Sequence, residues 1–493
     1  MMRWSLQTLP AVADAAEALS AARLALSRER RPRAGAPHVL RVEVPLAAVD
    51  PLAWLMAHPF EAPLAFADRD GTLAVAGRGV ALRIAAGAGE ALSTLSALER
   101  SLQAAPPRLR LFGAMAFTDD DERDACWQGL GEGTWLLPRV EVGWDLQGAW
   151  LAVHVACAEG DDPARGVADA LAALARLAKA AVAPANPAAA ASSAALAAWP
   201  ALRSRRDAPE RAPYAAAVAD ALLEIESGAV DKVVLARRSE LRFAAAIDPA
   251  AALARLASLE PSSFRFCIPG QGAAWIGASP ERLLRVGEPG ASGRPGRELV
   301  TEAMAGTRPR GADAGADALL CLALRGSGKD GREHALVVSG IAAALAELAL
   351  GEVEVGAIDV HCCTAVQHLR TPIAARLRPG VQVAAVLAAL HPTAAVAGWP
   401  RRPALALLRR LEPFDRGLYA APVGWIGAAG AEFAVGLRGA VIRGSNVTLH
   451  AGAGLVAGSD AAEEWAEIEA KVEATLRALS ATSKAPNAPG LSA

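Results

Sequence analysis

The chain has 493 residues, which is enough to bury a large core and too many for one ordinary small domain. Its 50 Lys and Arg residues nearly balance 52 Asp and Glu residues, and the formal net charge is -2. This balance excludes a global field that would attract nucleic acid or an anionic membrane. An anionic ligand must therefore be bound by a local cluster of groups.

The six cysteines form no C-x-x-C pair and no spacing that suits zinc. The N-terminus lacks the continuous apolar stretch of an export signal, and Asp14, Glu17 and Glu29 argue against a transit peptide. The longest uncharged stretch, 180–202, is rich in Ala and interrupted by prolines, so it predicts a linker and not a membrane span. We therefore expect a cytoplasmic protein with reduced thiols.

In chain order, the first half is predicted to be mostly strand. A helix is expected over 11–33, where apolar residues recur at helical spacing, and further helices at 90–104 and 163–182. The sequence from Asp68 to Gly71 predicts a hairpin turn. The predicted strands are 38–46, 63–68, 72–76, 79–84, 110–117, 134–142 and 149–155.

A segment rich in Pro, Ala and Ser at about 183–201 divides this half from a second half, in which longer helices alternate with strands. We expect a mostly β N-terminal half over 1–200, a catalytic region over 201–482 and a disordered tail over 483–493. The implied class is α+β, with large antiparallel sheets and helices packed around them.

A candidate base lies in the strand predicted over 230–237. There Lys232 shares a face with Val230, Val234 and Ala236. Enclosure disfavours an ammonium ion, which suits a lysine to act as a base. An edge-strand lysine that prevents aggregation would give the same pattern, so the strand alone does not decide between the two.

A candidate acid lies in the segment 275–284. The predicted strand ends in a turn of small residues and restarts after Pro280, which places Glu281 at a sharp bend. A carboxylate at the mouth of a sheet is partly buried and suits acid catalysis. An ion pair between Glu281 and Arg282 is the alternative interpretation.

Further carboxylates fall on two predicted helices. Glu333 lies in the first turn of one of them. The D-x-x-E pattern at 460–463 begins the other, on which Glu464, Glu467 and Lys471 lie along one side. Oxygen ligands in this number suit magnesium, although a solvated helix face would show the same spacing.

Candidate anion contacts occur on a strand predicted from Glu432 to Ile442. Small residues beside Arg438 leave room for a bidentate contact with a carboxylate. Gly306 with Thr307, and the Ala-Gly-Ala-Gly run at 451–454, offer backbone that a ligand can approach closely. Ordinary tight turns are the alternative.

Taken together and in order, these motifs resemble those of the chorismate-utilising enzymes, and among them most closely those of isochorismate synthases. The motifs span the second half: KVVLAR (232–237), GASPERL (277–283), TEAMAGT (301–307), REHALVV (332–338), HLRTPI (368–373), HPTAAVAG (391–398), EPFDRGLYAAPVGW (412–425), VGLRGA (435–440), AGAG (451–454) and EWAEIEAK (464–471). The resemblance implies the α+β chorismate-binding fold of anthranilate synthase component I, with two large, mainly antiparallel sheets above an active-site cleft.

By this resemblance, Lys232 would activate a water molecule as the base, and Glu281 would protonate the departing 4-hydroxyl as the acid. Glu333 and Glu467 would hold Mg2+, with Glu464 assisting through water. The remaining positions would bind substrate: Arg438, Gly452 and Lys471 at the enolpyruvyl carboxylate, Gly306, Thr307 and His368 on the ring side, and Ala395 as a further substrate-binding residue.

The implied reaction is the isomerisation of chorismate to isochorismate, in which water adds at C2 while the C4 hydroxyl leaves. Ala305 stands where aminodeoxychorismate synthases carry a nucleophilic lysine, and Lys232 is a residue that anthranilate synthases generally lack. Salicylate synthases, which go on to eliminate pyruvate, are the main alternative, against which the small Ala394 and Ala395 argue. A catalytically silent binding protein is a further alternative, but base, acid and both metal carboxylates are present together.

The partners implied are therefore few. We expect chorismate as the small-molecule substrate, no nucleic acid or membrane, and no glutamine amidotransferase subunit. The chain is expected to be a monomer. The isochorismate could serve menaquinone, siderophore or salicylate biosynthesis, and the sequence does not separate these pathways.

Overall fold

The computed structural model describes residues 2–28, 37–59, 62–119, 123–131, 133–157, 162–180, 199–288 and 295–480. The predicted tail at 483–493 and nearly all of the predicted linker at 183–201 lie outside the described residues. No helix within the described stretches is both long and apolar enough to cross a membrane.

Strands join into one hydrogen-bonded network in the described part of the chain. The strands of the first half are β1 (Arg3–Thr8), β2 (His38–Leu46), β3 (Pro63–Ala67), β4 (Leu73–Ala85), β5 (Arg110–Met115), β6 (Gly133–Asp145) and β7 (Gly148–Cys157). Those of the second half are β8 (Leu202–Ala208), β9 (Lys232–Phe243), β10 (Phe264–Pro269), β11 (Ala274–Ser279), β12 (Arg282–Val286), β13 (Arg297–Pro309), β14 (Glu354–Val355), β15 (Asp359–Cys362), β16 (Val366–Leu377), β17 (Gly398–Trp399), β18 (Pro422–Gly427), β19 (Gly430–Val435), β20 (Gly439–Arg443) and β21 (Asn446–Leu455). Neighbouring strands are mainly antiparallel, and β1 with β2 is a parallel pair.

Several helices begin where the sequence provides a cap. Asp50, Asp248 and Asp460 each accept hydrogen bonds from backbone N–H groups in the first turn of the helix that comes next. Pro51 and Pro249 occupy first-turn positions, where a missing N–H costs nothing. The helical elements are α1 (Ala15–Arg28), α2 (Pro51–Ala57), α3 (Ala91–Leu102), the 3-10 turn η1 (Ala125–Trp127), α4 (Pro163–Ala180), α6 (Arg211–Glu226), α7 (Pro249–Leu259), α8 (Ala314–Gly326), α9 (Gly328–Ala346), α10 (Val383–Leu390), α11 (Arg401–Leu411) and α12 (Ala461–Ala478).

The long strand β6 is the point at which the network divides into two sheets. Its residues 133–136 pair with β5, whereas residues 140–145 pair with β7. The first sheet continues from β6 through β4, β3, β10, β11, β20, β21 and β9. The second sheet continues from β6 through β5, β18, β19, β12, β13 and β16. Both sheets therefore contain strands from both halves of the chain.

The chain passes between the two sheets at two neighbouring points. A short link that contains Glu281 joins β11 of the first sheet to β12 of the second, and a link that contains Arg438 joins β19 of the second to β20 of the first. The backbone N–H of Val435 donates to the carbonyl of Glu281 at 3.1 Å, and that of Ala278 donates to the carbonyl of Arg438 at 3.2 Å. The two crossing links are thus bonded to each other's strands.

Aromatic side chains fill the core between the sheets. Phe66 on β3 lies with its ring centroid 6.2 Å from that of Phe112 on β5, and 6.3 Å from that of Phe264 on β10. Trp135 on β6 meets Phe433 on β19 edge to face at 5.8 Å. Such buried pairs contribute about 0.5–1.5 kcal/mol beyond the area that they bury, so they help to fix how the two sheets are stacked.

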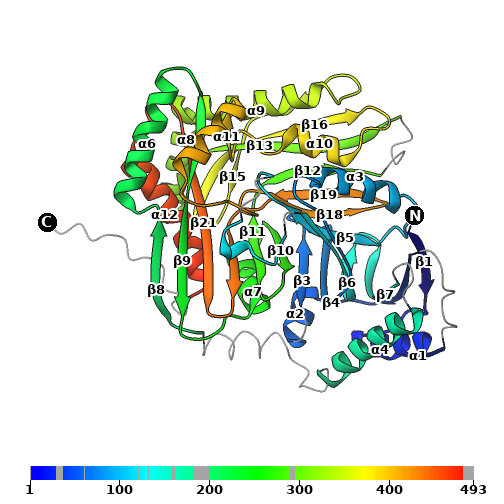
Figure 1. The fold of residues 1–493 in the computed structure, drawn as a ribbon. Coiled ribbons are helices and arrows are strands. Elements are labelled where there is room, and N and C mark those ends of the chain that lie inside the picture. The colour runs from blue at the N-terminus through cyan, green and yellow to red at the C-terminus, as the bar shows by residue number, and fades with distance from the viewer. Residues whose placement is uncertain are drawn as a thin grey trace.

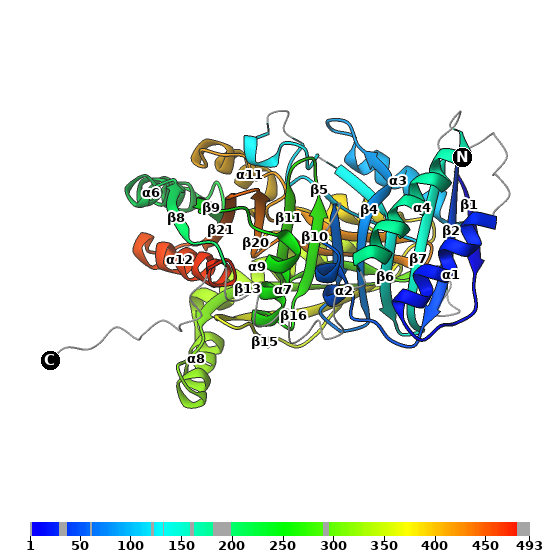
Figure 2. The same ribbon diagram turned by 90° about the horizontal axis from the view of Figure 1, so that it is seen from below.

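Helices cover both ends of the sheets (Figures 1 and 2). The pair α1 and α4 packs beside β2 and β7 at one end, whereas α6 and α12 lie together at the other, near β9 and β21. Between them, α9 lies along β13 and α3 packs on α10. The last helix and α9 therefore flank the region in which the chain crosses between the sheets.

Most of the predicted elements are confirmed, including the helices α3 and α4 and the hairpin between β3 and β4. The single strand predicted from Glu432 to Ile442 is wrong, because Arg438 has a φ of 47° and the chain changes sheets there. The separate strands predicted at 72–76 and 79–84 are also wrong. They form the single strand β4, in which a register shift between Val80 and Leu82 interrupts the alternation.

The shared sheets predict that the second half does not fold by itself. A chain of residues 199–493 would expose the edge of β10 that β3 covers and the edge of β18 that β5 covers. We expect this fragment to aggregate, and co-expression with residues 1–180 to restore a soluble complex. Size-exclusion chromatography with thermal unfolding measures both. A cooperative unfolding transition of the isolated fragment would contradict the prediction.

Candidate functional site

A cleft with a cavity volume of about 100 Å³ opens beside the two crossing links. Its walls come from β9, β13, α9, β16, β21 and α12, and from the two crossing links and nearby loops. All the predicted site residues except Lys232 and Glu464 line this cleft: Glu281, Gly306, Thr307, Glu333, His368, Ala395, Arg438, Gly452, Glu467 and Lys471. Positions that are far apart in the sequence are therefore brought together in one place.

Glu281 occupies the first crossing link, at a bend between two strands, and its residue surface is only 4 % exposed. Burial and the neighbouring carboxylate of Glu302 raise its pKa to about 8, although Lys232, Arg69 and Lys471 act in the opposite direction. A carboxylic acid with this pKa keeps its proton near neutral pH. Glu281 is therefore equipped to donate a proton into the cleft.

Lys232 is the first residue of β9, and its side chain is fully buried. Its Nζ lies 2.9 Å from Oε1 of Glu333. The contact is an ion pair without hydrogen-bond alignment, because Nζ has no aligned acceptor among the described residues. The amine therefore keeps its capacity to hydrogen-bond a ligand.

Gly454 on β21 leaves the space in which Lys232 and Glu333 come together. A Cβ at this position would stand 2.6 Å from Oε1 of Glu333 and 3.1 Å from Cε of Lys232. Gly454 also lines the cleft, so the amine reaches the cleft wall beneath a residue that has no side chain.

Two acidic residues of α12, Glu464 and Glu467, each contact a lysine. Glu467 accepts from Nζ of Lys471 at 2.7 Å, and the same Nζ donates to the carbonyl of Gly452 at 2.8 Å. Glu464 is 3 % exposed and accepts from Nζ of Lys329 at 2.9 Å. Burial and the nearby Glu467 raise the pKa of Glu464, and Lys329 opposes this shift.

The carboxylates at the cleft can be tested as metal ligands. Among the described residues, no three or more His, Cys, Asp and Glu side chains are grouped to hold a metal ion. Glu333 and Glu467 nevertheless both line the cleft, and magnesium often takes one or two carboxylates and completes its shell with water and substrate oxygens. Two oxygen donors facing one cleft fit that ion.

Arg438 lies in the second crossing link and is held by two partners. Its Nη1 donates to Oε1 of Glu260 at 3.2 Å, and its Nη2 lies 3.1 Å from Nε2 of His368. Because a guanidinium cannot accept, Nε2 must accept, which assigns the proton to Nδ1 and lets it donate to Oγ1 of Thr307 at 3.1 Å. Burial and Arg438 lower the pKa of His368 well below its usual value, so its ring is neutral.

Gly306 lies in β13 and not in an isolated turn. Its φ is +78°, and the pairing of β13 with β16 shifts register between Ala305 and Thr307. The bulge turns Thr307 toward His368. Ala305 is buried and lines the cleft.

Two aromatic residues of the cleft wall were missed by the sequence interpretation. The ring of His450 stacks on Tyr419 at 5.4 Å and on Trp127 at 5.3 Å. Burial lowers the pKa of His450 to about 3 and raises that of Tyr419. Tyr419 belongs to the motif at 412–425, but the sequence analysis gave this residue no role. Nothing in the sequence pointed to His450.

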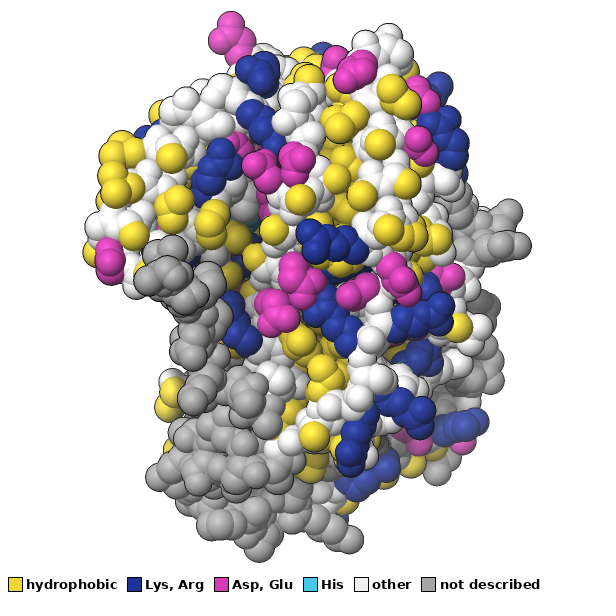
Figure 3. Space-filling view, turned by 90° about the vertical axis from the view of Figure 1, so that its left-hand side faces the viewer, with side chains coloured by type: hydrophobic (Ala, Val, Ile, Leu, Met, Phe, Trp, Pro, Cys, Tyr) yellow, Lys and Arg dark blue, Asp and Glu magenta, His cyan; other side chains and the backbone are white. Residues whose placement is uncertain are grey.

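The outer face that carries α6 and α12 shows intermixed charges. Figure 3 displays side chains of Lys and Arg next to those of Asp and Glu across the described part of this face. This mixture agrees with the near-zero net charge. Attraction of an anion thus depends on groups inside the cleft, above all Arg438 and Lys471.

Comparison with known proteins adds independent information. A family model described as chorismate binding enzyme matches residues 23–480. A salicylate biosynthesis isochorismate synthase of Pseudomonas aeruginosa is 41% identical over 275 residues, 56% of each chain, and the isochorismate synthase MenF of Bacillus subtilis is 32% identical over 371 residues, 75% of this chain and 74% of the relative. The chain thus spans about half to three quarters of these curated relatives.

Two solved structures have a similar fold. The menaquinone-specific isochorismate synthase MenF of Escherichia coli superimposes with a TM-score of 0.77 at 29% identity, covering 94% of this chain and 99% of that one. Anthranilate synthase component I of Streptococcus pneumoniae gives a TM-score of 0.66 at 18% identity, over 82% of this chain and 92% of that one. The second likeness concerns the fold alone.

The raised pKa of Glu281 predicts a pH-dependent stability. An ordinary glutamate has a pKa of 4.5 and Glu281 one of about 8, so between these values the folded chain holds a proton that the unfolded chain has lost. Its contribution to stability is complete below pH 4.5 and is lost as the pH rises toward 8. We expect Glu281→Gln to be more stable than the wild type by an amount that grows over this range to a few kcal/mol.

Thermal unfolding of both proteins at about pH 5 and about pH 8 measures this difference. Asp317→Asn is a suitable control, because Asp317 is solvated and its pKa is lowered to about 2 by Arg310, well below the range tested. A stability difference between wild type and Glu281→Gln that stays constant with pH would show that Glu281 is not protonated in the folded chain.

Proposed function

Because the chain belongs to the chorismate-binding enzyme family, we propose that it converts chorismate to isochorismate. The family and the α+β fold, both predicted from the sequence, are confirmed. The observation that carries the proposal is a buried acid, Glu281, that keeps its proton in a cleft whose wall, at Gly454, covers Lys232. The names of the curated relatives support it.

In this reaction a water oxygen bonds to C2, the ring double bonds shift and the C4–oxygen bond breaks. Lys232 takes a proton from the attacking water, and Glu281 gives its proton to the departing hydroxyl, which leaves as water. The atoms therefore balance without a net change in composition. Burial keeps bulk water from both groups, so that only a positioned water molecule reacts.

We propose that Glu333 and Glu467 hold Mg2+, with Glu464 assisting through a water molecule. The ion would neutralise the ring carboxylate of chorismate and fix its orientation. Glu333 is also the partner of Lys232, so the ammonium form of this lysine and the metal compete for one carboxylate. Binding of Glu333 to the metal would release Nζ of Lys232 from this ion pair.

The enolpyruvyl carboxylate is assigned to Arg438, Lys471 and the backbone of Gly452. Arg438 points from the crossing link and is oriented by Glu260 and His368, and Lys471 is held at Gly452. Gly306, Thr307, His368 and Ala395 then border the ring, since all of them line the same cleft.

The alternatives differ either in the step after water addition or in the nucleophile. Salicylate synthases continue to eliminate pyruvate, and anthranilate synthases use ammonia. The small Ala394 and Ala395 favour release of isochorismate, and Lys232 favours water. With water as the nucleophile, no glutamine amidotransferase subunit is required, and we propose that the chain acts as a monomer.

Product analysis tests the proposal. We expect the purified protein with chorismate and Mg2+ to form isochorismate, and to form chorismate when it is supplied with isochorismate. Chromatography of the reaction mixture measures both directions, and addition of a chelator is expected to stop them. Salicylate with pyruvate, or anthranilate formed only with ammonia, would replace this proposal by one of the alternatives.

The role of Lys232 predicts the effect of two substitutions. Lys232→Arg keeps a cation for Glu333 but cannot give up a proton near neutral pH, and Lys232→Ala removes the amine. We expect both to lower kcat by a factor of about 100–10,000 while thermal unfolding remains cooperative. Substantial activity in either folded variant would place the base elsewhere.

Gly454 tests the geometry of the base. Gly454→Ala would push its Cβ against Glu333 and Lys232, and a displacement of about 1 Å can cost about a hundredfold in rate. Gly326→Ala is the matched control, because no atom lies within 4 Å of its added Cβ. We expect a loss of activity only for Gly454→Ala. Equal activities of the two variants would show that the close contact of Lys232 with Glu333 is unimportant for the reaction.

A further inference from the structure

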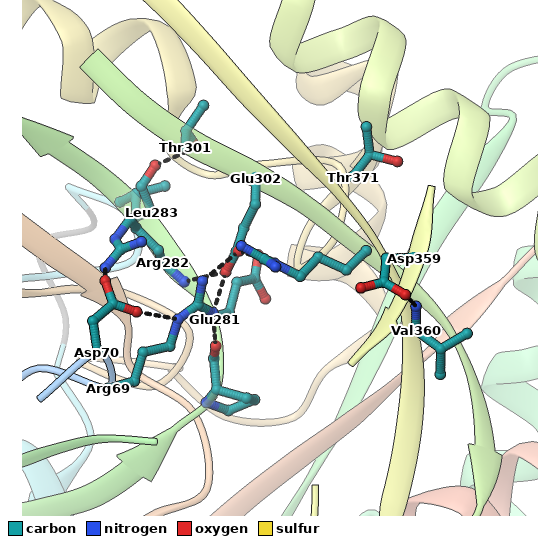
Figure 4. Close-up of polar contacts among 12 residues, drawn as sticks. Arg69, Asp70, Glu281, Arg282, Leu283, Thr301, Glu302, Asp359, Val360 and Thr371 are labelled. Carbon is teal, nitrogen blue, oxygen red and sulfur yellow. Dashed lines mark hydrogen bonds and ion pairs between the residues drawn. The ribbon is translucent and has the colours of Figure 1, made fainter. Parts of the chain in front are cut away.

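The hairpin between β3 and β4 brings the N-terminal half of the chain to the acid of the cleft. Asp68 accepts from the backbone N–H of Thr72 at 2.9 Å and from its hydroxyl, and Gly71 supplies a φ of +69°. The turn is therefore fixed by its own hydrogen bonds. It presents Arg69, whose side chain is only 5 % exposed, toward Glu281 (Figure 4).

The guanidinium of Arg69 makes a bidentate contact with Glu302 on β13. Nη1 lies 2.5 Å from Oε1, and Nη2 lies 2.6 Å from Oε2. Nη1 also donates to the carbonyl of Pro280, the residue directly before Glu281. Arg69 thus ties the crossing link to the second sheet.

Glu302 holds the other side of the acid. Its Oε1 accepts from the backbone N–H of Arg282 at 2.9 Å, and its Oε2 accepts from Nε of Arg370 at 2.6 Å. The peptide groups before and after Glu281 are therefore both fixed by the pair of Arg69 and Glu302. These two bonds fix the backbone position from which the side chain of Glu281 extends.

We propose that Arg69 is a positioning residue for the reaction: together with Glu302 it fixes the backbone around Glu281 and balances the charge beside it. The inference rests on the proposed role of Glu281 as the acid. It assigns a function in the cleft to the N-terminal half, since the hairpin that carries Arg69 lies far from the second half in sequence.

Among the described residues, charged and titratable groups from several elements act on Glu281. Glu302 from β13 raises its pKa, whereas Lys232 from β9, Arg69 from the hairpin and Lys471 from α12 lower it, and Tyr419 also feels its charge. Removal of Arg69 deletes a cation and leaves Glu302 less well neutralised, and both changes raise the pKa of Glu281. Removal of the Glu302 charge has the opposite effect.

A solely structural role would make a different prediction. Arg282 bonds Asp70 and Glu432 close by, so the hairpin belongs to a wider buried ion network that stabilises the junction of the sheets. If Arg69 served stability alone, its replacement would lower the unfolding temperature without moving the titration of Glu281. The sign of the pKa change therefore separates the two roles.

The test compares Arg69→Met and Glu302→Gln with a control, Arg78→Met. Arg78 is a similarly buried arginine on β4 that donates to the carbonyl of Leu55 in α2. Infrared difference spectroscopy monitors the protonated carboxyl of Glu281, which is identified by its loss in Glu281→Gln. The midpoint should rise by at least about half a pH unit in Arg69→Met, fall in Glu302→Gln and stay in place in Arg78→Met.

Activity provides the second readout. The alkaline limb of the pH profile of kcat, where the acid loses its proton, should move in the same directions. Arg69→Lys should restore the position of this limb but only part of kcat, because lysine keeps the charge but cannot make the bidentate contact with Glu302. Unmoved midpoints in both variants would overturn the proposal. If the wild type fails to turn over chorismate, the proposed function is wrong, and the infrared titration still decides whether Arg69 governs Glu281.

Discussion

The backbone hydrogen bonds between the two crossing links are the constraint on which the site depends. They hold Glu281 to Val435 and Arg438 to Ala278 at the place where the chain leaves one sheet for the other. The side chains of both links, Glu281 and Arg438, line the cleft. Glu281 and Arg438 thus owe their positions to a single topological feature, and Arg438 adopts a left-handed backbone conformation where the chain changes sheets.

Around this junction, charge is balanced group by group. Glu333, Glu464 and Glu467 each contact a lysine, and Glu302 is shared by two arginines. Glu281 is the exception, since no cation of the described residues pairs with its side chain, and it responds to burial by keeping its proton. A buried proton donor among ionised neighbours is costly for stability and useful for catalysis. Burial of Glu281 therefore lowers the stability of the folded chain.

Much of this was predictable from the sequence. The strand that carries Lys232, the bend at Glu281 and the helix that carries Glu467 are consequences of local periodicity and capping. The break at Arg438 was not predictable, because the pattern of alternation continues through 432–442 and only the pairing partners show that the chain changes sheets. The contact of Arg69 with Glu302 was equally hidden, since it joins distant segments and depends on the tertiary fold.

The central claim is that Lys232 and Glu281 add water at one carbon and remove a hydroxyl at another. Turnover of chorismate in water enriched in oxygen-18, combined with mass spectrometry of the isochorismate, tests it most directly. If the two residues act in this way, the new C2 hydroxyl carries the label from the solvent. Unlabelled isochorismate would mean that the hydroxyl moves within the substrate, and would contradict the proposed roles of both residues.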